Sequence, residues 1–281
     1  MRASAATCSC IALLAPVYAF MTARPLSTSQ AGLPPRLRAG GAFFMSASEV
    51  PKVDKVAAVL LAGGVGKRMQ ADRPKQFLEL NGKPVLQHSL DLFLSLEGVH
   101  QIVMVLDEQY RDLFQDLQQQ EPRLVFADPG KERQDSVYNA LQQVVEGTSV
   151  VCIHDAARPL VTKDCVYKVL SDAEQHGAAV LGVPMKVTVK ESEDGEFVLR
   201  TIDRSRLWDI QTPQVVKPDI LRHGFEKVEA EGWEVTDDVS IVEQLDLPVK
   251  LTMGEYTNLK LTTPEDLVIA SQILQGREAN R

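Results

Sequence analysis

The sequence lacks the features that mark several common classes of protein. It has four cysteines in 281 residues and no Cys-x-x-Cys pair, so neither a zinc site nor a disulfide framework is predicted. Its five histidines form no His-Glu-x-x-His motif. A net charge of −8 provides no basic field for nucleic acid, and no apolar run is long enough to span a bilayer. We therefore expect neither a nucleic-acid partner nor a membrane partner.

Acidic residues are missing from the first 48 positions, which instead carry four arginines and many Ser, Thr and Ala. This composition is typical of a cleavable targeting segment. The short apolar stretch 11–20 and the Arg- and Ser-bearing tail after it resemble the two-part signal of algae with complex plastids. We expect residues 1–50 to be a disordered presequence and the mature protein to lie in the plastid (chloroplast) stroma. The alternative is a disordered tail that carries no targeting signal.

Two familiar phosphate-binding motifs are also absent, although a glycine-rich loop follows the strand predicted at 56–61. A P-loop needs Ser or Thr where Arg68 stands, and a dinucleotide-binding loop needs glycine where Met69 stands. Glycines at a strand end let backbone N–H groups form an anion-binding nest, and cations downstream neutralise a polyphosphate. The remaining pattern, Leu-x-Gly-Gly-x-Gly-x-Arg-Met followed by Pro-Lys, resembles the signature of nucleotidylyltransferases. The alternative is an ordinary glycine turn beside a solvated basic patch.

Short apolar strands alternate with helical patterns along residues 51–281, which we interpret as one catalytic domain. This order predicts an α/β fold with a Rossmann-like, mostly parallel sheet and helices on both faces. The expected strands are 56–61, 102–106, 124–127, 149–153, 178–181 and 249–253. The expected helices are 84–96, 110–119, 135–145, 164–176, 218–231, a helix from about 238 to 245, and a last helix that begins with a capping box at 263–266.

Three loops of this predicted fold, 62–75, 128–133 and 154–159, follow the carboxyl ends of strands. In open α/β sheets the ligand lies beyond those ends. We therefore expect the three loops to meet at one edge of the sheet and to form the binding site.

Residues 186–202 interrupt the alternation with a β-hairpin pattern around an Asp-Gly turn. An isolated hairpin has little core of its own. We therefore predict a protruding β-arm at about 186–204 through which the chain forms a homodimer.

A set of motifs occurs in order over residues 55–276. It comprises the glycine loop with Pro-Lys, 130–136, 154–159, 203–204, 212–214, 236–238 and 258–262. The ordered set resembles the 2-C-methyl-D-erythritol 4-phosphate cytidylyltransferases, and most closely their plant and algal plastid type. Position 131 departs from some bacterial members, because it is Lys where they carry Asp.

The resemblance implies transfer of CMP from CTP to methylerythritol phosphate with release of pyrophosphate, in the non-mevalonate isoprenoid pathway. It implies that Mg²⁺ or another divalent cation is held by the CTP phosphates, with Asp155 as the one possible protein ligand. It implies four catalytic residues: Arg68 and Lys75 stabilise the transition state, while Lys260 and the partner's copy of Arg204 position the acceptor phosphate. The residues implied to bind substrate are Ala62, Gly63, Gly64, Gly66, Gly130, Arg133, Ser136, Asp155, Ala156 and Thr188.

Other interpretations remain open. A ribitol 5-phosphate cytidylyltransferase would share the CTP loops, and a non-catalytic regulatory subunit could keep the glycine loop alone. Arg204 could form a surface salt bridge, Lys260 could be solvated, and Asp155 could cap a helix. We expect Arg158 to brace the pocket, and Asp237 and Asp238 to begin a helix rather than to bind a metal.

Overall fold

The computed structural model describes residues 52–64, 69 and 73–280, which belong to one compact unit, Phe44–Arg281. The predicted presequence lies outside the described residues. So do Gly66, Lys67 and Arg68 of the glycine-rich loop.

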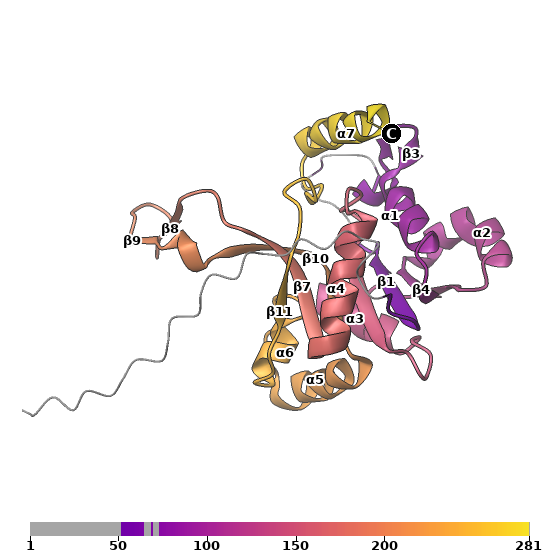
Figure 1. Ribbon diagram of the computed structural model, residues 1–281, viewed down its shortest axis with the longest axis horizontal. Helices are drawn as coiled ribbons and strands as arrows, with labels where there is room; N and C mark the ends of the chain where they lie inside the picture. Colours follow the sequence, from indigo (N-terminus) through magenta and orange to yellow (C-terminus); the bar gives the residue numbers. More distant parts are fainter. Residues whose placement is uncertain (1–51, 65–68, 70–72, 281) are drawn as a thin grey trace, which may run out of the picture. The chain divides into compact units, whose positions relative to one another are not determined.

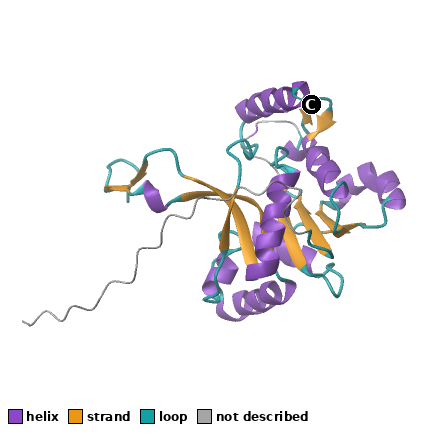
Figure 2. Cartoon of the chain, in the orientation of Figure 1, coloured by secondary structure: helices purple, strands orange, loops and turns teal. Residues whose placement is uncertain are grey.

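A seven-stranded sheet forms the centre of this unit (Figures 1 and 2), as the alternation of strands and helices predicts. Its strands, in spatial order, are β11 (Lys250–Met253), β7 (Ala178–Pro184), β10 (Trp208–Val216), β6 (Val150–Asp155), β1 (Val56–Leu61), β4 (Val99–Val105) and β5 (Leu124–Ala127). β10 runs antiparallel to β6 and β7, and the other neighbouring strands are paired in parallel.

β10 is the main departure from the predicted fold, because the sequence pattern assigned no strand to 208–216. Pro213 cannot donate to a strand ladder, and a proline inside a run argues against a central strand. The pairing of β10 with β7 accommodates it through a register shift between Ile210 and Gln214. Three polar side chains there, those of Gln211, Thr212 and Gln214, are nevertheless buried. The polar run therefore belongs to the sheet, where these side chains bond to Glu255, His154 and Asp237.

Helices cover both faces of the sheet, because alternate residues of each strand point to opposite sides. Ala58 and Leu60 of β1 face a core that includes α1 (Val85–Leu94) and α4 (Lys163–His176). Ala57 and Val59 face the opposite core, which includes α3 (Arg133–Leu141), α5 (Pro218–Glu231) and α6 (Ser240–Gln244).

Two further helical segments complete this part of the chain. The helix predicted at 110–119 is divided into a 3₁₀-helix, Glu108–Phe114, and α2, Gln115–Gln120. The last helix, α7 (Pro264–Ala279), begins with the predicted capping box between Thr263 and Asp266. It packs on a third apolar cluster together with the small hairpin of β2 (Glu79–Leu80) and β3 (Lys83–Pro84). No helix in the described ranges is long and apolar enough to cross a membrane.

The predicted arm is present as a short hairpin of β8 (Val189–Glu191) and β9 (Arg200–Ile202). Figure 1 shows both strands at the end of an extension that leads away from the central sheet. Gly195 supplies the positive φ of 77° at the turn. Phe197, Val198 and Leu199 are 74%, 60% and 54% exposed, so this single chain leaves an apolar arm uncovered.

Candidate active site

A cavity of about 380 Å³ lies where the strands of the sheet end. The three loops that the sequence predicted to converge all contribute to its wall, and so does the segment after β11. Its lining residues are Leu61, Ala62, Gly63, Gly64, Lys75, Gln76, Val105, Gly130, Lys131, Glu132, Arg133, Ser136, Asp155, Ala157 and Lys260.

Close backbone packing fixes two glycines of this wall. A Cβ atom on Gly130 would lie 2.1 Å from Cβ of Asp135, at the start of α3. A Cβ atom on Gly63 would lie 2.5 Å from Cβ of Pro129, so the loops after β1 and β5 touch each other. The Gly130 amide donates to Ser136 Oγ at 3.0 Å, which ties the loop to the first turn of α3. That helix N-terminus, with its partial positive charge, therefore borders the cavity.

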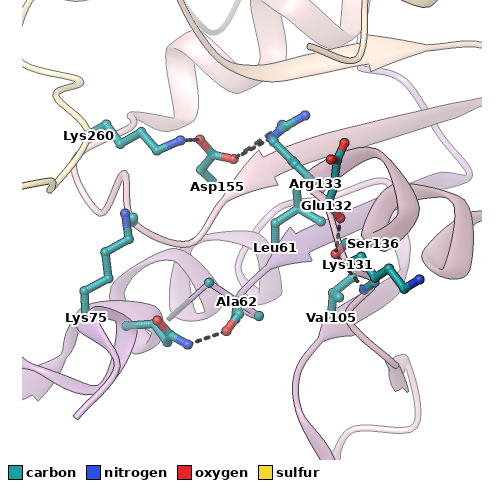
Figure 3. Close-up of a pocket in the computed structure, with 15 residues that line it drawn as sticks. Leu61, Ala62, Lys75, Val105, Lys131, Glu132, Arg133, Ser136, Asp155 and Lys260 are labelled. Atoms are coloured by element: carbon teal, nitrogen blue, oxygen red, sulfur yellow. Dashed lines mark hydrogen bonds and ion pairs between the residues drawn. The ribbon is translucent and has the colours of Figure 1, made fainter. Parts of the chain in front are cut away.

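A chain of alternating charges crosses the cavity (Figure 3). Lys260 Nζ lies 2.6 Å from Asp155 Oδ2, and Arg133 Nε and Nη2 both lie 3.3 Å from Asp155 Oδ1. Arg133 also makes a bidentate pair with Asp238, with Nη1 2.6 Å from Oδ1 and Nη2 2.8 Å from Oδ2. The four side chains come from separate segments, so this chain of charges holds the loops after β5, β6 and β11 and the start of α6 together.

Burial by itself would raise the pKa of Asp155, but the positive charges of Arg133 and Lys260 outweigh it and lower that pKa. Burial likewise opposes the charge on Arg133, and the carboxylates of Asp238 and Asp155 raise its pKa in spite of it. Asp155 is therefore ionised at neutral pH and holds both cations in place.

Lys75 comes from the segment after the glycine-rich loop, and its side chain is drawn toward Asp155 and Lys260 in Figure 3. Its Nζ donates to the carbonyl of Leu261 at 3.0 Å, next to Lys260. The buried amide of Gln76 donates to the carbonyl of Ala62, which anchors the start of the glycine-rich loop. Two lysines from distant parts of the chain are thereby directed to one side of the cavity.

The structure gathers nine of the predicted site residues in the cavity wall: Ala62, Gly63, Gly64, Lys75, Gly130, Arg133, Ser136, Asp155 and Lys260. Three other described residues of the predicted site do not line the cavity. Ala156 is fully buried and its N–H donates to Leu61 O at 3.1 Å, whereas the adjacent Ala157 lines the cavity. Thr188 and Arg204 are exposed in the arm segment, where Arg204 Nη1 donates to the carbonyl of Lys186. Gly66 and Arg68 lie outside the described residues.

Sequence reasoning assigned no site role to Gln76, Glu132, Ala157 or Asp238. Asp237 holds the turn that leads into α6, since its Oδ1 accepts from the amide of Ser240, the first residue of that helix, at 3.0 Å. Asp238 instead pairs with Arg133, 105 residues away. No local pattern distinguishes these two neighbouring aspartates, so only the fold could assign them different partners. The predicted brace at Arg158 agrees with its hydrogen bonds to Asn258 O at 2.7 Å and Ile210 O at 3.4 Å.

Among the residues that the structure describes, no group of three or more His, Cys, Asp or Glu side chains is placed to hold a metal ion. Each oxygen of the Asp155 carboxylate already faces a cation, Arg133 on Oδ1 and Lys260 on Oδ2.

A sheet edge that combines a glycine-rich loop with fixed cations is suited to nucleotidyl transfer, and the chain is a nucleotidyltransferase. Residues 56–276 match the family model described as IspD, 2-C-methyl-D-erythritol 4-phosphate cytidylyltransferase. The chain belongs to this family.

Relatives and solved structures agree with this assignment. The chain is 52% identical over 230 residues to the chloroplastic 2-C-methyl-D-erythritol 4-phosphate cytidylyltransferase of Oryza sativa, which covers 82% of this chain and 77% of the relative. It is 44% identical to the enzyme of that name from Geobacillus thermodenitrificans, over 79% of this chain and 98% of the relative. The solved 4-diphosphocytidyl-2C-methyl-D-erythritol synthase from Anaerococcus prevotii has a TM-score of 0.70 and 28% identity, over 79% of this chain and 96% of that one.

Proposed function

We propose that this enzyme transfers CMP from CTP to 2-C-methyl-D-erythritol 4-phosphate and releases pyrophosphate. The observation that carries the proposal is the chain of charges from Lys260 through Asp155 to Arg133, within a cavity bordered by the glycine-rich loop. Family membership identifies the two substrates, since relatives that share 44–52% of their residues with this chain carry that name.

In this reaction an oxygen of the acceptor phosphate attacks the α-phosphorus of CTP in line. The bond from that phosphorus to the bridging oxygen breaks, and pyrophosphate leaves with the bonding electrons. Positioning and fixed positive charge supply most of the catalysis in such transfers. Lys75 faces the region where charge builds, Lys260 holds the acceptor phosphate, and the amides of Gly63 and Gly64 cradle the triphosphate. The Ala62 amide donates to Val105 O at 3.0 Å, so Ala62 would contribute its place in the wall and not its N–H. Arg68 would add charge beside Lys75, although it lies outside the described residues.

The base and ribose of CTP would occupy the side of the cavity formed by Gly130, Arg133 and Ser136. The missing side chain of Gly130 lets this loop pack directly on Asp135, which fixes the wall at the start of α3. Lys131, which replaces the Asp of some bacterial members, lines the same wall and adds a positive charge there.

Mg²⁺ or another divalent cation would be held mainly by phosphate oxygens of CTP, with Asp155 as a possible protein ligand. When bound, it would neutralise part of the phosphate charge. Because Asp155 is already paired with two cations, its role toward the metal would be secondary to its role in holding Lys260 and Arg133.

The exposed arm supports a homodimer in which each arm completes the other site. Thr188 and Arg204 do not line the cavity of their own chain, yet both are polar and exposed beside an uncovered apolar stretch. A partner's Arg204 guanidinium would supply a bidentate donor for the acceptor phosphate. The acid-free N-terminus and the chloroplastic relative support delivery of the enzyme to the plastid stroma.

The decisive experiment is pyrophosphate release by the purified protein with Mg²⁺ and each of CTP, ATP, GTP and UTP. Methylerythritol phosphate and ribitol 5-phosphate are compared as acceptors, and Lys75→Ala is the control variant. We expect turnover with CTP and methylerythritol phosphate, reduced on the order of 10²–10³-fold in the variant. Turnover with ribitol phosphate instead would overturn the acceptor, and no turnover with any pair would favour a regulatory subunit.

A further inference from the structure

His154 is a buried titratable group that the proposed reaction leaves unused. It is the residue before Asp155 in β6 and is 0% exposed. Its ring lies 5.4 Å from that of Phe93, and its hydrogen-bond partners are a carbonyl and a hydroxyl. A charge buried without an ionic partner is costly, so the imidazole is neutral and carries a single N–H.

Its two hydrogen bonds determine which nitrogen carries that proton. His154 Nε2 lies 3.2 Å from the carbonyl oxygen of Arg158, and a carbonyl can only accept. The proton is therefore on Nε2, and Nδ1 is an acceptor. The Thr212 hydroxyl, 3.0 Å from Nδ1, must then donate to it.

The same hydroxyl reaches the site. Thr212 Oγ1 also accepts a hydrogen bond from the backbone N–H of Asp155 at 3.1 Å. Because the hydroxyl proton points to His154, a lone pair of Oγ1 faces the Asp155 amide. Asp155 begins a turn that ends at Arg158, since the Arg158 amide donates to Asp155 O at 2.9 Å. The far end of the turn is also held by His154, because the Arg158 carbonyl accepts from its ring. A single ring thus fixes both ends of the turn that presents Asp155.

We propose that His154 is a positioning residue, which orients the Thr212 hydroxyl and through it holds the Asp155 carboxylate between Lys260 and Arg133. It touches no substrate, and its effect on turnover passes through the placement of Lys260. Arg133 has a second anchor in Asp238, whereas among the described residues Lys260 pairs with Asp155 alone. Loss of the His154 contact should therefore affect the acceptor side of the site more than the CTP side.

Two substitutions at His154 separate its two hydrogen bonds. In His154→Asn the amide oxygen takes the place of Nδ1 and can still accept from Thr212. In His154→Gln the amide takes the place of Nε2 and keeps only the contact with Arg158. This test rests on the proposed function, so kcat and both KM values are measured for cytidylyl transfer to methylerythritol phosphate.

We expect His154→Gln to lower kcat/KM for the acceptor on the order of 10–100-fold, with KM for CTP nearly unchanged, and His154→Asn to recover most of the loss. Thr212→Val should reproduce the defect and Thr212→Ser should not, which keeps the test decisive if the histidine variants do not fold. Equal losses in the Asn and Gln variants, or wild-type kinetics in Thr212→Val, would overturn the proposal.

A second readout needs no activity. Long-range ¹⁵N–¹H NMR spectra of the wild-type protein should show His154 as the neutral Nε2–H tautomer from pH 7.5 down to about pH 5.5. A neutral Nδ1–H tautomer or an imidazolium in that range would overturn the proposal. If the wild-type enzyme did not turn over CTP and methylerythritol phosphate, the proposed function would fail, while the NMR result would still test the hydrogen-bond network.

Discussion

Asp155 determines where two cations of the site lie, although it is itself an anion in a cavity suited to phosphates. Its carboxylate is 10% exposed and receives Lys260 on one oxygen and Arg133 on the other. Without it, two positive charges would share a partly buried site and Lys260 would be free to reorient toward solvent. The carboxylate is best understood as the group that keeps these cations in place before the substrates bind.

Asp155→Asn should therefore reduce kcat for cytidylyl transfer on the order of 10²-fold, because Lys260 loses its ionic partner and its position. Steady-state kinetics with CTP and methylerythritol phosphate measure this. Asp172→Asn is the matched control, since Asp172 lies in α4, accepts from the Thr252 hydroxyl at 2.6 Å and does not line the cavity. An Asp155→Asn enzyme as active as the Asp172→Asn enzyme would contradict the assignment.

At the scale of elements, the loop after β5 and the start of α3 behave as one unit. Gly130 packs directly on Asp135, and the Gly130 amide is bonded to Ser136. Any side chain at position 130 must push the loop away from the helix N-terminus that borders the cavity.

Gly130→Ala should destabilise the fold by on the order of 1–3 kcal/mol and raise KM for CTP, because overpacking displaces the loop. Thermal unfolding and substrate titration measure the two effects. Gly276→Ala in α7 is the control: its Cβ meets nothing within 4 Å, and alanine in a helix should add about 1 kcal/mol. If both variants melted at the same temperature, the close packing at Gly130 would not matter.

Periodicity and capping predicted most of these elements from the sequence, since strand runs and helix starts are local signals. α5 has the bounds 218–231 that the pattern predicts, and α7 begins at its capping box. The sequence pattern missed β10 because Pro213 and its polar neighbours are typical of a loop. Only the folded structure gives these polar side chains buried hydrogen-bond partners. The meeting of three loops followed from topology, but the pairing of Arg133 with Asp238 depends on tertiary contacts that no local pattern contains.

At the scale of the whole molecule, the arm concentrates apolar surface where this chain has no core to cover it. Phe197→Asp, at 74% exposure, should weaken or abolish the proposed homodimer and reduce activity, because the partner's Arg204 would no longer reach the site. Sedimentation at micromolar concentration together with an activity assay tests both parts. Leu113→Asp, equally exposed at 70% but in the 3₁₀-helix before α2, should leave the dimer intact. A monomeric wild-type enzyme with full activity would refute the arm's role.

The buried ring of His154 should also make the stability of the whole molecule sensitive to mild acid. Its pKa is about 4 in the folded protein and about 6.5 when unfolded. Between these values the unfolded chain binds one more proton, so the free energy of unfolding falls as pH falls, by about 2 kcal/mol from pH 6.5 to 5. The lowered pKa of Asp155 acts in the same direction only below about pH 4, the usual range of a free carboxyl.

Urea unfolding at pH 7 and pH 5, at one fixed protein concentration because of the proposed dimer, measures this loss. His154→Gln removes the titrating group, so its free energy of unfolding should fall by about 2 kcal/mol less than that of the wild type over the same interval. Both proteins keep the same carboxylates, so acid effects that do not involve His154 cancel in the difference. Equal losses in the two proteins would mean that His154 can take up a proton in the folded state. The assignment of a neutral ring with its proton on Nε2 would then be refuted.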